Sequence, residues 1–101
     1  MDRGSLEKML EQGNDNALLR YTLGSLCLKE QDAEMAVHHL AEAVNQDQNH
    51  SASWKLYGKA LVALHREDEA RQAYQKGIAV AEARGDVQAA KEMGVFLKRL
   101  G

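Results

Sequence analysis

The sequence of 101 residues has no proline, a single cysteine, few aromatic residues and no long apolar run. Without proline, no residue lacks a backbone donor inside an element, so a chain of this composition favours helix almost throughout. A single cysteine, Cys27, excludes an internal disulfide. No run is long enough to cross a bilayer, and the charged residues 1–8 lack the apolar core of a signal peptide. We therefore expect a cytoplasmic protein that has no membrane partner.

The chain also has no large excess of positive or negative residues. The formal net charge is -2, with 13 lysines and arginines against 15 acidic residues. Binding to phosphates requires clustered basic residues, so we expect no nucleic-acid partner. With 45% hydrophobic and 28% charged residues, the chain has the composition of a soluble protein, and its length predicts one domain over residues 1–101.

Apolar residues recur at spacings of three and four, which predicts six helices. The expected ranges are about 2–12, 16–30, 33–45, 51–65, 67–84 and 87–100. The segment Asn14-Asp15-Asn16 is expected to supply a turn and an N-cap for the second range, and Asp32 and Asp86 are expected to cap the ranges that follow them, whereas Gly13 and Gly85 follow two ranges and are expected to end them. The short connections between the ranges predict antiparallel hairpins.

Small and large residues repeat along the chain at a fixed distance. Three pairs lie 34 residues apart: Gly24 and Gly58, Ala36 and Ala70, and Leu40 and Tyr74. A glycine inside a helix costs about 1 kcal/mol relative to alanine, so a closely approaching neighbour must compensate for it. A period of this length is typical of a helical repeat array.

The repeated residues resemble the pattern of the tetratricopeptide repeat (TPR) family. The second copy reads Trp54-x₂-Tyr57-Gly58-x₂-Leu61 and then Ala70-x₃-Tyr74, and a half copy reads Ala90-x₂-Met93-Gly94-x₂-Leu97. The half copy begins two residues late, and Gln48 and Glu82 stand where the family has proline. The resemblance implies an all-α, right-handed α-solenoid of antiparallel helical hairpins. Its parts would be a capping helix (1–13), two repeats (16–49 and 50–84) and a C-terminal half repeat (86–100).

The resemblance also implies a binding surface. In TPR proteins the first helix of each hairpin lines a concave face that holds a peptide. Carried over by position, this face would comprise Tyr21, Ser25, Leu28, Lys55, Lys59, Val62, Gln88, Lys91 and Val95. The three lysines predict a basic strip suited to an acidic segment of another protein. Alternatively, they are ordinary solvated charges that keep the chain soluble.

Two functions follow from this interpretation. We favour a non-enzymatic protein-protein interaction module that binds a peptide segment of a partner on the concave face. The alternative is a self-associating structural scaffold, such as a homodimer, because a short array has two open ends where apolar surface is often covered by a second copy.

Groups with distinctive chemistry are few. His38 and His39 are adjacent and would point about 100° apart on a helix, and no H-x₃-H or Cys-x₂-Cys spacing is present, so we expect no metal and no cofactor. Cys27 occupies a core position of the repeat and is expected to be buried and inert rather than reactive. With no nucleophile near a base and no glycine-rich phosphate loop, we expect no enzyme.

Overall fold

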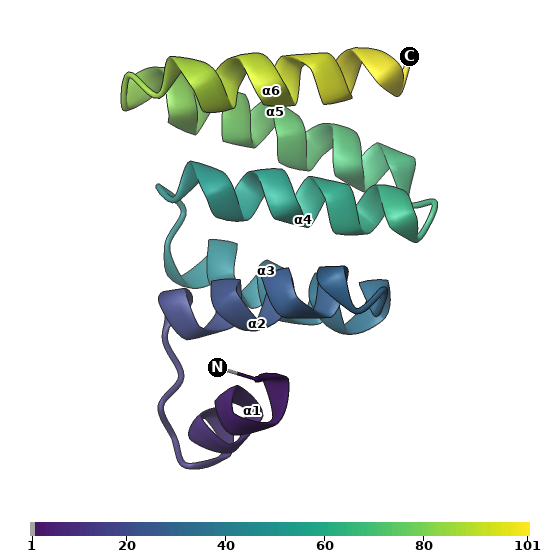
Figure 1. Ribbon diagram of the computed structural model, residues 1–101. Coiled ribbons are helices and arrows are strands. Elements are labelled where there is room, and N and C mark those ends of the chain that lie inside the picture. The colour runs from purple at the N-terminus through teal and green to yellow at the C-terminus, as the bar shows by residue number, and fades with distance from the viewer. Residues whose placement is uncertain (1) are drawn as a thin grey trace.

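The computed structural model describes residues 2–101, which form six helices and no strand (Figure 1). The helices are α1 (Arg3–Glu11), α2 (Ala17–Lys29), α3 (Ala33–Gln46), α4 (Ser51–Ala63), α5 (Glu67–Ala83) and α6 (Val87–Arg99). These bounds agree with the predicted ranges to within two residues. The predicted all-α solenoid of antiparallel helical hairpins is confirmed.

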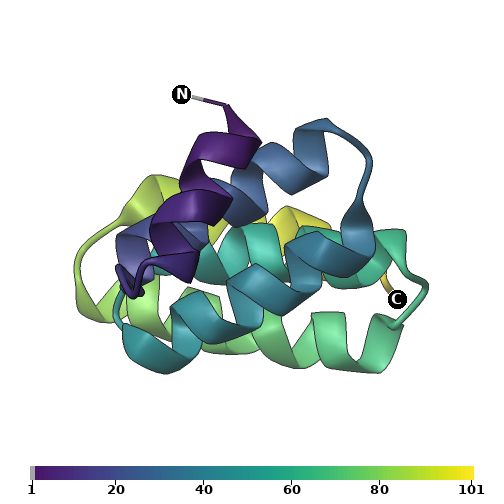
Figure 2. The same ribbon diagram turned by 90° about the horizontal axis from the view of Figure 1, so that it is seen from below.

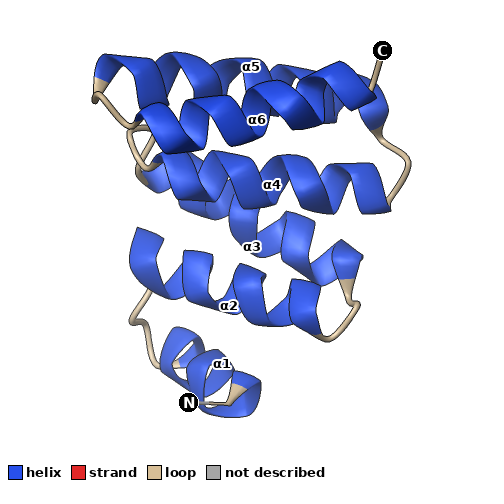
Figure 3. Ribbon diagram, turned by 45° about the horizontal axis from the view of Figure 1, so that its top comes forward, coloured by secondary structure: helices blue, strands red, loops and turns tan. Residues whose placement is uncertain are grey.

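The helices stack in chain order to form two layers. In Figure 1, α2, α4 and α6 form the nearer layer, with α3 and α5 behind it, and α1 lies at one end of the stack. Each helix packs on the next along the chain, and α2–α4 and α4–α6 are also in contact. Figures 2 and 3 show the same stack from two other directions, with short loops joining the helices. The result is an elongated body of 39 × 28 × 19 Å.

The turns inside the two hairpins have the same backbone structure. Gln31 and His65, which are 34 residues apart, both adopt left-handed φ values, of 63° and 59°. In each turn this residue donates to a carbonyl three residues back, and the next residue donates to a carbonyl five residues back. These paired bonds form a Schellman motif, which satisfies the last carbonyls of the helix. The period seen in the side chains therefore extends to the backbone hydrogen bonds.

Four helices begin at a side chain that accepts a hydrogen bond from a backbone amide three residues later. These residues are Asp2, Asn16, Asp32 and Asp86. Such caps satisfy amides that have no partner inside the helix. The caps predicted at Asp32 and Asp86 are therefore confirmed, and within the segment Asn14-Asp15-Asn16 the capping residue is Asn16.

The two-residue delay of the half copy results from a helix that is three residues longer and a following connection, residues 84–86, that is one residue shorter than residues 47–50. α5 has 17 residues, whereas α3, its counterpart in the first hairpin, has 14. Gly85 then ends the segment with a left-handed φ of 74°. The delay therefore leaves the start of α5 in register and shifts only α6.

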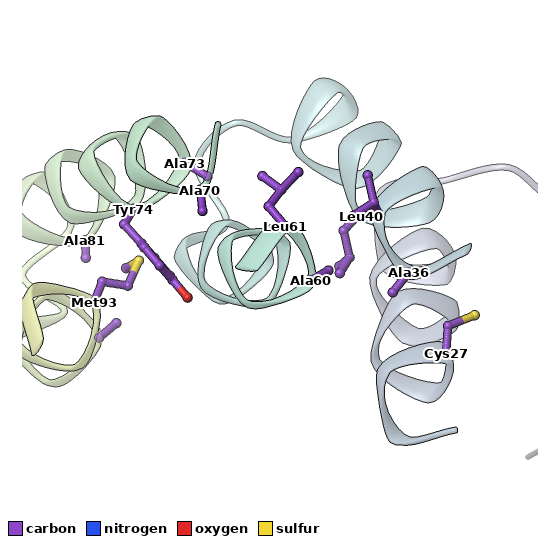
Figure 4. Packing of buried hydrophobic residues seen from close by; sticks show 12 residues of the cluster. Cys27, Ala36, Leu40, Ala60, Leu61, Ala70, Ala73, Tyr74, Ala81 and Met93 are labelled. Atoms are coloured by element: carbon purple, nitrogen blue, oxygen red, sulfur yellow. The ribbon is translucent and has the colours of Figure 1, made fainter. Parts of the chain in front are cut away.

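A glycine on the first helix of each hairpin contacts a large side chain on the second. A Cβ added to Gly24 would lie 2.7 Å from Cδ2 of Leu40, and one added to Gly58 would lie 2.7 Å from Cδ1 of Tyr74. Leu40 is fully buried and Tyr74 is 2% exposed. Figure 4 shows Tyr74 reaching from α5 toward α4 and Met93. The glycines thus permit the close helix approach that the repeat predicts.

The first helix is fixed by one arginine. The guanidinium of Arg3 donates to Glu30 at 3.1 Å and to Asp32 at 2.9 Å, both in the turn that follows α2. Asp32 also accepts from the amide of Met35 at the start of α3. The Arg3 guanidinium, and then this amide, hold the pKa of Asp32 below its ordinary value. One carboxylate therefore caps α3 and holds α1 in place.

Replacing Gly58 by alanine is expected to lower the free energy of unfolding by about 1–3 kcal/mol, because the added methyl group collides with the buried ring of Tyr74. Urea denaturation measures the change. The matched control is Gly94→Ala, since a Cβ on Gly94 meets no atom within 4 Å. That control is expected to raise stability by about 0.5–1 kcal/mol. Equal losses at the two sites would contradict the packing described here.

One buried histidine interrupts the apolar packing of α3. His39 is 3% exposed, and its Nδ1 lies 3.2 Å from a guanidinium nitrogen of Arg20 on α2. Arginine only donates, so Nδ1 accepts and the ring proton is on Nε2, which is buried without a hydrogen-bond partner among residues 2–101. Burial, and then the positive charges of Arg20, His38 and Arg3, lower the pKa of His39 from 6.5, while Glu7 opposes them weakly.

Stability is expected to fall as the pH drops below about 6.5. Because the pKa of His39 is lower in the folded chain, the unfolded chain binds more protons between the two pKa values. The stabilisation is complete above the unfolded pKa and is lost as the pH falls toward the folded one. Urea denaturation between about pH 8 and pH 5 measures the loss.

The variant His39→Gln should flatten this dependence, whereas His65→Gln, which changes an exposed histidine that does not affect the pKa of His39, should retain it. A slope that survives in His39→Gln would assign the titration to another group.

Candidate functional site

The nine predicted binding positions all lie on the layer formed by α2, α4 and α6. α2 carries Tyr21, Ser25 and Leu28, α4 carries Lys55, Lys59 and Val62, and α6 carries Gln88, Lys91 and Val95. Only Lys59, Gln88, Lys91 and Val95 are exposed, and the other five are half-buried. Among the predicted positions, the exposed ones therefore lie on α4 and α6.

Lys55 is engaged within the chain. Its Nζ lies 3.4 Å from a carboxylate oxygen of Glu92, so the pair bridges α4 and α6. The side chain of Lys55 is 23% exposed and that of Glu92 is 38% exposed. A ligand at this point would meet an ion pair, because the charge of the lysine is largely balanced.

Lys59 and Val62 lie together beside an aromatic ring. The Nζ of Lys59 is 5.0 Å from the ring centroid of Phe96, a distance that gives a cation–π contact. Both residues line a pocket of about 210 Å³, which we call the anchor pocket. Its lining residues are Lys59, Val62, Tyr74, Phe96, Arg99 and Leu100. The structure therefore brings two of the predicted positions into one concave feature.

Lys91 lies in a different depression. That depression has a volume of about 420 Å³ and is lined by Ile78, Glu82, Gly85, Val87, Ala90, Lys91 and Gly94. The reason is the rotation of α6. Glu92, one position after Lys91, faces α4, so Lys91 points about 100° away around the helix. The structure does not bring Lys91 into the anchor pocket with Lys59.

Counted from the glycine of each copy, the positions predicted on α6 also begin about one helical turn before those predicted on α2 and α4. Tyr21 and Lys55 each lie three residues before the glycine of their copy, but Gln88 lies six residues before Gly94. Counted from Gly94 in the same way, the positions equivalent to the α2 and α4 sets are Lys91, Val95 and Lys98.

The α2 positions contribute mainly to packing. Tyr21 meets the ring of His50 at 4.9 Å between centroids and 87° between planes, an edge-to-face contact with the residue that precedes α4. Tyr21 and Leu28 also pack against the main hydrophobic cluster. These contacts fix α2 against α4, and they leave only part of each side chain available to a ligand.

Two residues of the anchor pocket, Phe96 and Arg99, were not predicted as site residues. Together with Glu92 they follow the four-and-three spacing of one helix stripe, and Glu92 and Phe96 meet Lys55 and Lys59 across the α4–α6 contact. That spacing was visible in the sequence. The sequence does not show which neighbouring helix this stripe faces, because that depends on how α6 is rotated about its axis.

No group of three or more histidine, cysteine and acidic side chains is placed to hold a metal ion within residues 2–101. None of the six helices combines the length and the apolar character needed to cross a bilayer.

Cys27 is fully buried in the main hydrophobic cluster. Burial raises the pKa of its thiol, an effect that the nearby Arg3 only partly opposes. A raised pKa reduces the thiolate fraction, and the thiolate is the reactive form. The thiol therefore has the surroundings of a core residue, as the sequence predicts.

The chain is similar to a known protein family, to a named bacterial protein and to a solved structure. Residues 5–77 match the family described as anaphase-promoting complex, cyclosome, subunit 3. The TPR repeat-containing protein PA0015 of Pseudomonas aeruginosa is 54% identical over 95 residues, which cover 94% of this chain and 90% of that protein. The solution structure of protein BPP2914 from Bordetella parapertussis is 43% identical with a TM-score of 0.83, and the match covers 99% of this chain and 87% of that one. Both likenesses therefore concern nearly the whole helical stack.

Proposed function

The chain belongs to the tetratricopeptide repeat (TPR) family, and from this membership we propose that it binds a peptide segment of a partner protein on the face formed by α2, α4 and α6. The family consists in general of non-catalytic modules for protein–protein interaction.

The anchor pocket is the observation that supports this face. It lies between α4, α5 and α6 and combines the apolar side chains of Val62 and Phe96 with the exposed cation of Lys59. Peptide-binding surfaces typically combine pockets for side chains with polar groups that fix the orientation of the chain. The opposite layer, formed by α3 and α5, carries the large side chains that fill the hairpins from inside.

We further propose that the bound segment is acidic. Lys59 and Lys91 are exposed and make no ion pair with any carboxylate of residues 2–101. Unpaired cations favour association with a negative segment and reject a positive one.

Panning a random phage-displayed peptide library on the purified chain tests this function. Enriched peptides, when synthesised and titrated into ¹⁵N-labelled protein, should shift the amide signals of α2, α4 and α6 more than those of α3 and α5. The variant Lys59→Glu should weaken binding about tenfold or more, since it places like charge against an acidic peptide.

Lys76→Glu is the matched control, because Lys76 is exposed on α5 and makes the same change of charge. Its affinity should stay close to that of the wild type, and both variants should keep their helical circular dichroism. Shifts confined to α3 and α5 would refute the proposed face.

Self-association is a second candidate, because one specific surface favours it. In both hairpins a glycine contacts a large side chain of the following helix, but no atom lies within 4 Å of a Cβ on Gly94. Val87 and Val95 on the same helix are 61% and 49% exposed. An open helix face of this kind is suited to a second copy of the chain.

Light scattering over a wide range of concentration tests the second candidate. A scaffold predicts a mass that rises with concentration and returns to the monomer value in Val87→Glu, which adds a charge to the face. A monomer mass throughout would leave peptide binding as the sole proposal.

A further inference from the structure

The anchor pocket is lined by residues from α4, α5 and the C-terminal end of α6. Tyr74, which is 2% exposed, forms the base from α5, and Leu100 forms one wall at the end of α6. The carbonyl of Leu100 accepts a hydrogen bond from Arg71 of α5 at 3.2 Å, which fixes this wall. The pocket is therefore lined from α4, α5 and α6 and from Leu100, the residue that caps the C-terminal end of α6.

Two cations flank the only phenylalanine of the chain. The Nζ of Lys59 lies 5.0 Å from the ring centroid of Phe96, and Cζ of Arg99 lies 5.9 Å from it. Neither cation pairs with a carboxylate of residues 2–101, as is also true of Lys8, Lys29, Lys76, Arg84, Lys91 and Lys98, but only Lys59 and Arg99 lie over an aromatic ring in that range. The pocket thus combines an apolar interior with two positive charges at its rim.

The dipole of α6 explains only one of these charges. Arg99 lies in the last turn of α6, where a cation is favoured by the partial negative charge of the helix end. Lys59 is in the middle of α4 and has no such reason to be basic. The same ring therefore receives cations from two helices, which concentrates positive charge at one point.

We propose that the anchor pocket takes a single aliphatic or aromatic side chain of a partner peptide, and that Lys59 and Arg99 bind carboxylates on the residues beside it. This inference rests on the proposed function and specifies its ligand. The volume of about 210 Å³ is below the range of about 300–1,000 Å³ that is usual for small-molecule sites, which favours one side chain over a cofactor. The charges favour an acidic segment over a second copy of this chain, whose α6 brings Lys91, Lys98 and Arg99.

Each part of this ligand matches one part of the pocket. The apolar side chain would cover Val62 and the free surface of Phe96, and central, well-packed contacts of this kind contribute most of the binding energy at interfaces. The flanking carboxylates would exclude water from cations already desolvated on one side by the ring, which strengthens both interactions. The required pattern is one large apolar residue with acidic neighbours.

The test uses the peptides enriched by panning on the full chain, synthesised with a fluorophore and a C-terminal amide. The enriched sequences should contain Leu, Ile, Met or Phe with Asp or Glu among the adjacent positions. Fluorescence anisotropy should show a loss of about tenfold or more when the apolar residue is replaced by serine, and a similar loss when the acidic residues are replaced by glutamine. Added sodium chloride should weaken the parent peptide more than the glutamine form.

Variants of the protein test whether the acidic peptide binds at the anchor pocket. The double variant Lys59→Glu/Arg99→Glu should bind the acidic peptide at least about tenfold more weakly, whereas Lys8→Glu/Lys76→Glu, which changes two exposed lysines elsewhere, should bind it as the wild type does. Phe96→Leu keeps the pocket apolar, so it should remain folded by circular dichroism and lose affinity because the ring that holds Lys59 and Arg99 and meets the apolar side chain is gone.

The outcomes separate this inference from the proposed function. Peptides that bind to α2, α4 and α6 but tolerate serine at the apolar position, or that are basic, overturn the inference and leave the function standing. No enrichment over an uncoated surface overturns both. A concentration-dependent dimer that is abolished by Arg99→Glu assigns the pocket to a second copy and also overturns the inference.

Discussion

The close contact between a glycine and a large buried side chain sets the spacing of the helices. Gly24 accommodates Leu40 and Gly58 accommodates Tyr74, and the two members of each pair come from successive helices of one hairpin. Because the glycine has no Cβ, the large residue fills the gap and remains buried. The same side chain of Tyr74 forms the base of the anchor pocket. The side chain that closes the second hairpin thus also lines the surface feature between α4, α5 and α6.

The two ends of the helical stack differ in the contacts that their last helices make. At the N-terminal end, α1 contacts α2 alone among the helices described, and it is held by Leu6 in a small apolar cluster and by the ion pairs of Arg3. At the other end, α6 leaves Gly94 uncovered and two valines exposed. One end is closed by charges whose partners belong to this chain. The other presents an apolar helix face to its surroundings.

The repeat and the helix limits could be predicted from the sequence because they depend on local signals. A glycine period of 34 residues, caps such as Asp32, and the absence of proline are all visible without coordinates. The site could be predicted only in part. The pairing of Lys55 with Glu92 joins residues 37 apart, and the position of Phe96 depends on how α6 is rotated against α4. The division of the chain at residues 13, 49 and 84, and the concave-face assignment, stay predictions.

The matching turns at Gln31 and His65 have a consequence for the evolution of chain length. Each turn uses the same left-handed residue and the same pair of backbone bonds, and each hairpin closes through the same glycine contact. A hairpin of this kind can form at any position along the chain, because each hairpin contacts only the hairpins next to it. Duplication of one 34-residue segment would therefore add a unit without disturbing those on either side. The turns and glycine contacts set the spacing of the hairpins, whereas the number of hairpins can change under selection.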